Sequence, residues 1–496
     1  MLYITIIIPS LMYRSRLDQN LGKQTLDYVS SISDDLEIAF YDIIGSQAHA
    51  IMLYENKVIT KLEIKKILQA LEKLKKEKFQ NNSSAEDIHE LIESLVIKKT
   101  GVKVGGKMHT ARSRNDQVAL DLRMKIRDDI NILCRCILDT IETLVMLSEK
   151  HTGTPMPLYT HLQQAQIGTF SHYLLAYSDA LFRDLDRLYA SYGRVNESPL
   201  GAGPVGGTSI PIDRNATAKM LGFKGLVENS IDATSSRDVV AEYVGAVAIL
   251  MTNLSRIAED LIIWSTSEFG FVELSDQFSS PSSVMPQKKN PDILELTRGK
   301  TARAIGNLTA VLSTVKGLAS GYGRDLQEIK PSVWSSSKIA ISALLVINAM
   351  FATLKVNKEK MKDVSNSGYL IALDVAEALV NEGLPFRTTH KIVGHLVQAA
   401  HESKKSLSQL TLTEVNKALK EKDIDSRKIL KIIASIDSES SLRNRTSQGS
   451  SGTSEQKRMA ANRKAKVGAY KSGVIKRSNE VSSSFDSLSK KVRSLI

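Results

Sequence analysis

The chain has 496 residues, of which 42% are hydrophobic and 24% charged, and this balance is that of an ordinary globular protein with one large core or several smaller ones. Aromatic residues make up only 5%, which favours helix packing over β-sandwiches. The net charge of +12 would suggest nucleic acid or a membrane surface as a partner. However, residues 441–496 hold 13 Lys and Arg against 3 Asp and Glu, so the remaining chain is close to neutral.

Neither the N-terminus nor the cysteines indicate export. Residues 1–12 are apolar but too short for a membrane helix, which needs about 20 residues, and we interpret them as an extension upstream of a start at Met12, or as a short strand. We expect no other stretch to span a bilayer. Cys134 and Cys136 point to different sides of a predicted helix, so a disulfide or metal pair is not expected and a reducing cytoplasm fits. The histidines show no ligand spacing, and we predict no metal.

The first hundred residues are predicted to be helical. Residues 28–53 form a helix with a break, and residues 57–79 form a Lys-rich amphipathic helix with apolar residues at helical spacing. The break contains Ser30-Ser31-Ile32-Ser33-Asp34-Asp35, where Ser31 either caps a helix or contacts a ligand.

A polar loop over residues 101–117 follows, and it includes Arg112, Arg114 and Asn115. Arginines flanked by hydroxyl and amide groups suit the bidentate binding of carboxylates. The alternative is a polar helix start whose charges only cap the helix.

Residues 118–356 are predicted to be almost wholly helical. Such long, apolar helices cannot all be covered inside one subunit, and we infer that they pack across subunits as a bundle. The five expected helices cover residues 118–150, 165–196, 237–266, 292–319 and 332–354.

Two connecting segments between these helices carry chemistry. Thr160 and His161, at the expected start of the second helix, offer a hydroxyl and a group that titrates near neutrality. Residues 279–295 begin with serines around Pro281, carry Lys288 and Lys289, and end at Asn290-Pro291-Asp292, which marks a helix start. Hydroxyls beside a fixed cation suit proton transfer next to a carboxylate, although a polar linker has a similar composition.

The C-terminal part is predicted to contain shorter helices over residues 357–436 and a Ser/Gly-rich linker over residues 438–453. The basic remainder has little apolar periodicity, so we expect it to be ordered in part at best.

Six separated motifs, in order, resemble the argininosuccinate lyase family of the fumarase/aspartase superfamily. The strongest is Ser282-Ser283-Val284-Met285-Pro286-Gln287-Lys288-Lys289-Asn290-Pro291, in which Pro281 replaces the usual glycine. The others are Ser30–Asp35, His109–Asp116, Tyr159–Gln166, Asn229–Asp238 and Tyr322–Lys330.

The resemblance implies an all-α fold of three helical domains, with a central bundle that forms a twenty-helix core in a homotetramer. The domains would be residues 13–110, 111–357 and 358–440, after the extension 1–12 and before the basic tail 441–496. The implied reaction is the cofactor-independent elimination of argininosuccinate to L-arginine and fumarate in the cytoplasm, at active sites shared between subunits.

The same resemblance assigns roles to twelve residues. Ser282 is the candidate base, His161 the candidate acid or proton relay, and Lys288 a stabiliser of developing negative charge; the reverse roles of Ser282 and His161 are equally allowed. The residues expected to bind substrate are Ser31, Arg114, Asn115, Thr160, Ser283, Asn290, Tyr322, Gln327 and Lys330.

Two other functions remain open from the sequence. A sister enzyme acting on adenylosuccinate is the nearest, although Tyr322, Gln327 and Lys330 argue against it. A non-enzymatic structural tetramer of the same fold is the second, and the presence of Ser282 and His161 argues against that. Nucleic-acid binding would rest on the basic tail alone.

Overall fold

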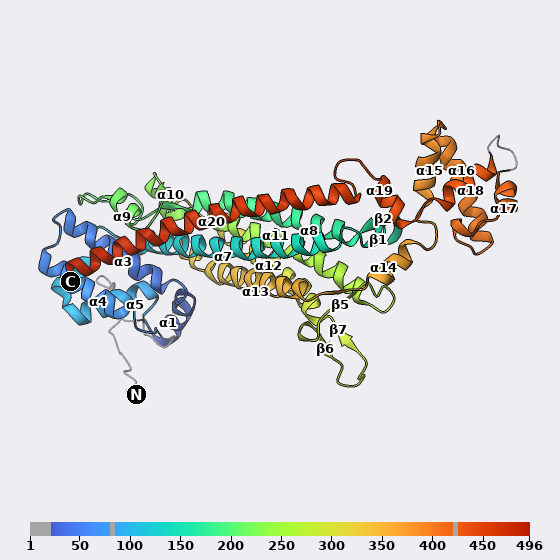
Figure 1. Cartoon of the computed structure of the whole chain (residues 1–496). Coiled ribbons are helices and arrows are strands. Elements are labelled where there is room, and N and C mark those ends of the chain that lie inside the picture. The colour runs from blue at the N-terminus through green and yellow to red at the C-terminus, as the bar shows by residue number, and fades with distance from the viewer. Residues whose placement is uncertain (1–20, 80–84, 420–424) are drawn as a thin grey trace.

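The computed structural model describes residues 21–79, 85–419 and 425–496, so the predicted extension over residues 1–12 lies outside the described part. The molecule is elongated, with long helices running side by side along its length (Figure 1). The all-α prediction is confirmed: strands form only four two-stranded pieces in the described part. The pairs are β1–β2 (Pro155–Thr160, Gln163–Thr169), β3–β4 (Glu197–Ser198, Gly225–Leu226), β5–β8 (Val272–Glu273, Lys355–Val356) and β6–β7 (Ser280–Pro281, Lys289–Asn290).

The central bundle contains the five predicted long helices. Their buried apolar residues recur at helical spacing and join one continuous core, to which Leu133, Tyr243 and Leu344 belong with no exposed surface. The second helix begins five residues later than predicted, because the residues before it pair as a strand. The bundle helices are α7 (Arg114–Lys150), α8 (Phe170–Val195), α11 (Asp238–Ser265), α12 (Asp292–Val315) and α13 (Lys330–Ala352).

Residues 324–352, which include α13, correct the expectation that the chain has no further stretch suited to a membrane span. They are long and apolar enough to cross a membrane by length and composition. Half of the apolar window is nevertheless buried inside the fold, where α13 packs against α7, α11 and α12. Bundle helices pass the same test because they too are covered on several sides.

An N-terminal group of helices lies at one end of the bundle (Figure 1). α4 begins with a full capping box, in which Thr60 and Glu63 bond each other's backbone N–H. Its apolar face joins the main core through Ile64, Ile67 and Leu71. The helices of this group are α1 (Lys23–Val29), α2 (Ile32–Asp35), α3 (Ala39–Glu55), α4 (Lys61–Leu74), α5 (Ile88–Thr100) and α6 (Val102–Gly105). Two short helices, α9 (Arg214–Met220) and α10 (Ser230–Ser235), lie at the same end.

A small helical unit lies at the opposite end of the bundle (Figure 1). It has a core of its own, built from residues such as Val375, Leu396 and Ile429, which is separate from the main core. Its helices are α15 (Ala372–Asn381), α16 (Phe386–Glu402), α17 (Leu412–Ala418), α18 (Ser426–Ala434) and α19 (Ser438–Asn444). The preceding helix, α14 (Lys358–Ser365), packs on β1 and buries Met361 in the main core.

The basic tail differs from its prediction. It forms α20 (Thr453–Leu495), a 43-residue helix that packs along α7 and α8 back toward the N-terminal helices (Figure 1). Its sparse apolar residues are spaced about two turns apart, and Val467, Val474 and Leu488 are buried on the bundle. The average hydrophobicity of the tail is low, so this single narrow stripe of apolar residues was not predicted from the sequence.

Charge also holds the tail in place. Lys471 bonds Glu142 of α7 at 2.7 Å, and Arg463 bonds Asp179 of α8. Much of the positive charge that suggested a nucleic-acid partner therefore faces carboxylates of the same chain.

Replacing Leu488 with alanine tests whether the tail belongs to the folded body. Leu488 is 1% exposed, so we expect a loss of about 2–5 kcal/mol in the free energy of unfolding. Ile475 lies on the same helix but is 56% exposed, and Ile475→Ala is expected to change stability by less than about 0.5 kcal/mol. Denaturant unfolding measures both; equal, small effects would mean that α20 is not packed in solution.

Candidate active site

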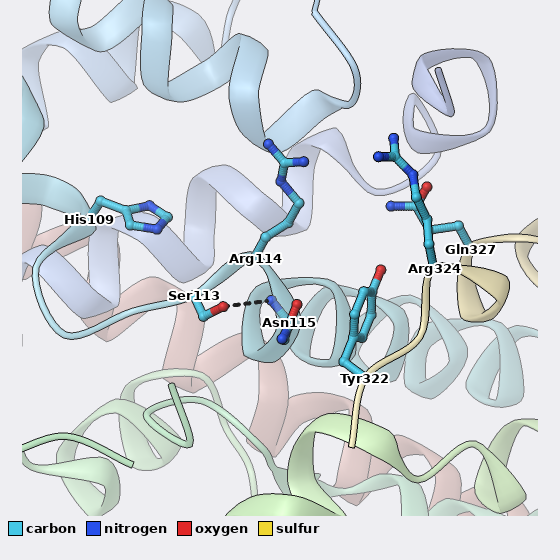
Figure 2. A pocket seen from close by; sticks show the side chains of 7 residues that line it. All are labelled: His109, Ser113, Arg114, Asn115, Tyr322, Arg324 and Gln327. Atoms are coloured by element: carbon cyan, nitrogen blue, oxygen red, sulfur yellow. Dashed lines mark hydrogen bonds between the residues drawn. The ribbon is translucent and has the colours of Figure 1, made fainter. Parts of the chain in front are cut away.

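A pocket of about 340 Å³ lies where α7 begins, between the N-terminal helices and the turn that precedes α13. Figure 2 shows the polar side chains that surround it. Four predicted binding residues line the pocket, namely Arg114, Asn115, Tyr322 and Gln327. His109, Ser113 and Arg324 complete the lining, and none of the three was predicted as a site residue from the sequence.

The start of α7 is fixed by its own residues. Ser113 is the N-cap and forms a capping box with Asp116, so Arg114 and Asn115 occupy the first turn. A helix start favours bound anions because its N–H groups and dipole point at them. Asn115 Nδ2 also donates to the carbonyl of Pro204 at 2.8 Å, in the glycine-rich turn over residues 199–207.

The side chain of Asp116 holds the glycine-rich turn against the start of α7. Its buried carboxylate accepts the backbone N–H groups of Gly201 and Gly203, both at 2.9 Å, and of Ser113 at 3.0 Å. Burial raises the pKa of Asp116, and these three donors oppose the rise. The carboxylate thus holds two segments, far apart in sequence, around Asn115.

Removing this carboxylate should damage both stability and the pocket. We expect Asp116→Ala to cost roughly 2–4 kcal/mol of stability, because buried N–H donors lose their acceptor, and to raise KM more than it lowers kcat. Asp116→Asn keeps part of the acceptor set and should be intermediate. Asp213→Ala is the control, since Asp213 only caps the nearby α9. Steady-state kinetics and thermal unfolding measure the effects, and an unchanged KM for Asp116→Ala would contradict this role.

Two arginines share one carboxylate at the pocket. Glu86 Oε2 lies 3.4 Å from Arg114 Nη1 and 3.2 Å from Arg324 Nη1. Arg114 Nε lies 3.0 Å from Asp87, and Arg324 also donates to the carbonyl of Val29 at 2.8 Å. Burial raises the pKa of Tyr322, whose hydroxyl points into the pocket and stays a neutral donor (Figure 2).

Ser31 and Lys330 lie close together but do not line the pocket. Ser31 Oγ donates to Asp35 at 2.8 Å, and Lys330 forms an ion pair with the same carboxylate. Lys330 is 1% exposed and Asp35 has no exposed surface. Asp35 was not predicted as a site residue, because the sequence of such a short helix does not indicate which of its side chains are buried.

A second polar cluster lies deeper and unites Asp42, His89 and Asp121, whose ligand atoms all lie within 4.8 Å of one another. His89 Nδ1 lies 3.0 Å from Asp42 and 3.5 Å from Asp121. Burial opposes protonation of His89, but the bond to Asp42 and the nearby carboxylates outweigh it and raise the pKa to about 9. Despite burial, the protonated ring in turn lowers the pKa of Asp42, whereas burial and the nearby charge of Asp42 raise the pKa of Asp121 well above its usual range.

Thr160 and His161 were predicted to lie at a helix start. They lie instead at the tip of the β1–β2 hairpin. His161 and Leu162 have φ values of 55° and 56°, the left-handed conformation that a tight hairpin turn requires. Both predicted residues are exposed. The hairpin lies at the end of the bundle opposite the N-terminal helices (Figure 1).

Ser282, Ser283 and Lys288 lie on the loop that joins β6 and β7, and Asn290 ends β7. The side chain of Ser282 accepts backbone N–H groups from Val284 at 3.2 Å and Met285 at 3.0 Å. These two donors would stabilise negative charge on the serine oxygen. The loop is anchored by Lys289, which lies 3.0 Å from Glu273 and 2.8 Å from Asp276.

One chain cannot bring the hairpin and the pocket together. Arg114 begins α7 and the hairpin follows its end, and a helix of 37 residues is roughly 55 Å long at 1.5 Å per residue. The predicted site residues therefore fall into three separate groups: the pocket with the Asp35 cluster behind it, the hairpin tip, and the β6–β7 loop. A long helical bundle with polar groups at both ends and along its side is the arrangement expected of a lyase of the fumarase type.

The comparisons with known proteins identify the family. Residues 14–306 match the model of a lyase family and residues 369–437 match that of the argininosuccinate lyase C-terminal region. The argininosuccinate lyase of Nitrosopumilus maritimus is 64% identical over 485 residues, covering 98% of this chain and all of that relative. That of Methanocaldococcus jannaschii is 44% identical, covering 81% and 84%. The chain belongs to the argininosuccinate lyase family.

Solved structures agree with the fold. An EDDS lyase in complex with formate superposes with a TM-score of 0.86 at 29% identity, covering 95% of this chain and 94% of that one. A class II fumarase from Schistosoma mansoni has a TM-score of 0.71 at 15% identity, covering 84% and 95%, and supports the fold alone. The predicted family, all-α fold and lyase class are therefore confirmed.

Proposed function

We propose that this protein catalyses the elimination of argininosuccinate to L-arginine and fumarate. The observation that carries the proposal is the donor-rich pocket at the start of α7, in a chain of this family. Arg114 and Asn115 offer charged and neutral donors to carboxylates of the substrate. Tyr322 and Gln327 lie across the same pocket and suit the polar groups of its arginine part.

The chemical step requires a base for the proton on the carbon next to a succinyl carboxylate. Negative charge then develops on that carboxylate, and preorganised donors stabilise it best in a site that excludes water. We assign this role to Lys288 and Asn290, with Thr160 and Ser283 holding carboxylates. Ser282 is our candidate base, and the N–H groups of Val284 and Met285 support its anion.

His161 would donate a proton toward the departing guanidinium. The opposite assignment, with His161 as acceptor and Ser282 as donor, satisfies the same proton balance. No cofactor is required in either case, because the substrate's own carboxylate serves as the electron sink. Residues 279–290 would act as a lid that excludes water.

We infer that a homotetramer assembles the complete site from different subunits. The separation of roughly 55 Å along α7 supports this, since it keeps His161 of one chain away from Arg114 of the same chain. Exposed apolar side chains on bundle helices, which a partner would cover, support it as well. They are Met146 on α7, Ile249 on α11, Leu296, Ile305 and Leu312 on α12, and Leu345 on α13.

The division into units and the location of the protein are part of the same proposal. We retain domains over residues 13–110, 111–357 and 358–440, and add residues 453–495 to the central bundle as α20. The reducing cytoplasm fits the two cysteines, which are both free.

Fumarate release tests the proposal directly. Argininosuccinate and adenylosuccinate are offered separately to the purified protein, and the new double bond is followed by ultraviolet absorbance. Turnover of argininosuccinate alone is expected. Turnover of adenylosuccinate would move the chain to the sister activity and undo the roles of Tyr322 and Gln327. Inactivity with both substrates, in a folded oligomer, would favour a structural role.

A further inference from the structure

A second cleft, which shares no residue with the pocket at the start of α7, lies between α8, α9 and α20. Its volume is about 740 Å³, within the range of small-molecule sites. The residues that matter to its chemistry are Tyr192, Lys219, Lys224, Lys476, Arg477 and Glu480.

Close backbone packing shapes the walls of the cleft. Gly222 has a φ of +70°, and a Cβ there would lie 3.2 Å from the Cα of Val481 on α20. A Cβ on Gly473 would lie 2.9 Å from the hydroxyl of Tyr189. Both glycines let α20 approach its neighbours closely, so the cleft is formed before any ligand arrives.

Arg127 is fully buried behind the cleft and supports residues that line it, although it does not line the cleft itself. Its guanidinium donates to Asn196 Oδ1 at 3.0 Å and to the carbonyls of Leu221 and Gly222 at 2.9 and 3.0 Å. Asp128 attracts this charge, but its carboxylate accepts from the hydroxyl of Tyr41. Within the described residues Arg127 has no ion pair.

Arg477 of α20 is a second buried cation, only 9% exposed. Its Nε donates to Asn131 at 2.6 Å and its Nη2 to Cys134 Sγ at 3.1 Å. The rings of Tyr189 and Tyr192 lie 4.1 and 4.4 Å from its guanidinium carbon. These neighbours fix the guanidinium in place, but among the described side chains no carboxylate pairs with it. A buried cation without a counter-charge is costly, and a bound anion would offset that cost.

The rim adds three exposed lysines, Lys219, Lys224 and Lys476. No ion pair involves any of them in the parts of the chain that the structure covers, although other basic residues of α20 pair with α7 and α8. Glu480 is the one acid among the lining residues. Four positive charges, those of Arg477 and the three lysines, thus line a space with a single carboxylate in its lining, and the buried charge of Arg127 lies behind them.

The cleft would stay open in the proposed assembly. α20 lies on the side of the bundle opposite α12 and α13 (Figure 1). Of the exposed large apolar side chains on the bundle helices and α20, four lie on α12 and α13, against one each on α7, α11 and α20.

We propose that this cleft binds a small phosphate-bearing anion, at a site separate from the lyase pocket. Clustered arginine and lysine side chains suit phosphate, which concentrates more than one negative charge in a small volume. The phosphate groups could belong to a free inorganic polyphosphate or to a nucleotide, and both present the same chemistry to the four cations that line the cleft.

Calorimetric titration of the full-length protein with pyrophosphate, ADP and adenosine, without divalent cations, tests the proposal. We compare wild type with a cleft variant, Lys219→Gln/Lys224→Gln/Lys476→Gln. A matched control, Lys360→Gln/Lys391→Gln/Lys417→Gln, removes three exposed lysines on α14, α16 and α17, away from the cleft. The thermal midpoint and lyase activity of each variant verify that it is folded.

We expect pyrophosphate, ADP or both to bind wild type and the control equally, and the cleft variant at least about tenfold more weakly. Binding of both anions would mean that phosphate alone is recognised, and binding of ADP alone that the nucleoside contributes as well. Failure of both anions to bind wild type would overturn the proposal. Equal affinity in the cleft variant, or binding of adenosine as strong as that of ADP, would overturn it too.

Discussion

Ser282→Ala is expected to lower kcat for fumarate release at least about a thousandfold, with a small change in KM. The reason is that the hydroxyl lies at the start of a tight loop and is prepared for proton transfer by the N–H groups of Val284 and Met285. Alanine leaves these two donors without their oxygen but removes no buried contact, since Ser282 is only half-buried. Steady-state kinetics with argininosuccinate measures the effect.

Ser279→Ala is the matched control for this variant. Ser279 lies on the same segment, and its hydroxyl bonds only the carbonyl of Ser275, at 3.3 Å. We expect its kcat to remain within about twofold of wild type. If Ser279→Ala and Ser282→Ala lost similar activity, the loop conformation and not the Ser282 hydroxyl would be responsible.

His161→Asn is expected to have the second largest effect, a loss in kcat of roughly a hundredfold to ten-thousandfold. Asparagine tolerates the positive φ of this position, so the hairpin turn is retained while the acid–base group is lost. His161 is exposed, and we therefore expect the thermal midpoint to stay unchanged.

His390→Asn, on the exposed surface of α16, is the control for the loss of an imidazole, and its activity should equal that of wild type. A His161→Asn enzyme that keeps wild-type kcat would exclude His161 from proton transfer. The roles of Ser282 and Thr160 would then need another proton partner.

The bundle could be predicted from the sequence because each long helix repeats its apolar residues over many turns. Such repetition makes small local errors unimportant, and the boundaries of α7 and α11 agree with the prediction to within a few residues. The hairpin before α8 was missed, since its strands are short and polar toward the tip. Its turn requires positive φ at His161 and Leu162, and these residue types do not indicate such a turn as Asn-Gly or Asp-Gly would.

The tail shows a different limit of the sequence. Its buried residues, such as Val474 and Leu488, are separated by long polar stretches, and its stability depends on carboxylates that lie more than 250 residues away.

The pocket is similar in this respect. The motifs identified Arg114 and Tyr322, but Arg324 and Asp116 gain their roles only from contacts with Glu86 and Gly201, which folding brings close.

The central claim is that each active site combines residues from different subunits, and subunit mixing tests it most directly. Ser282→Ala and Arg114→Ala proteins, each inactive alone, are denatured together, refolded and assayed for fumarate release from argininosuccinate. With random assembly, about one quarter of the sites receive both an intact pocket and an intact loop, so roughly a quarter of wild-type activity should return. Activity that stays at the sum of the two parents would contradict the account, because it would mean that the pocket and the β6–β7 loop of one chain serve the same site.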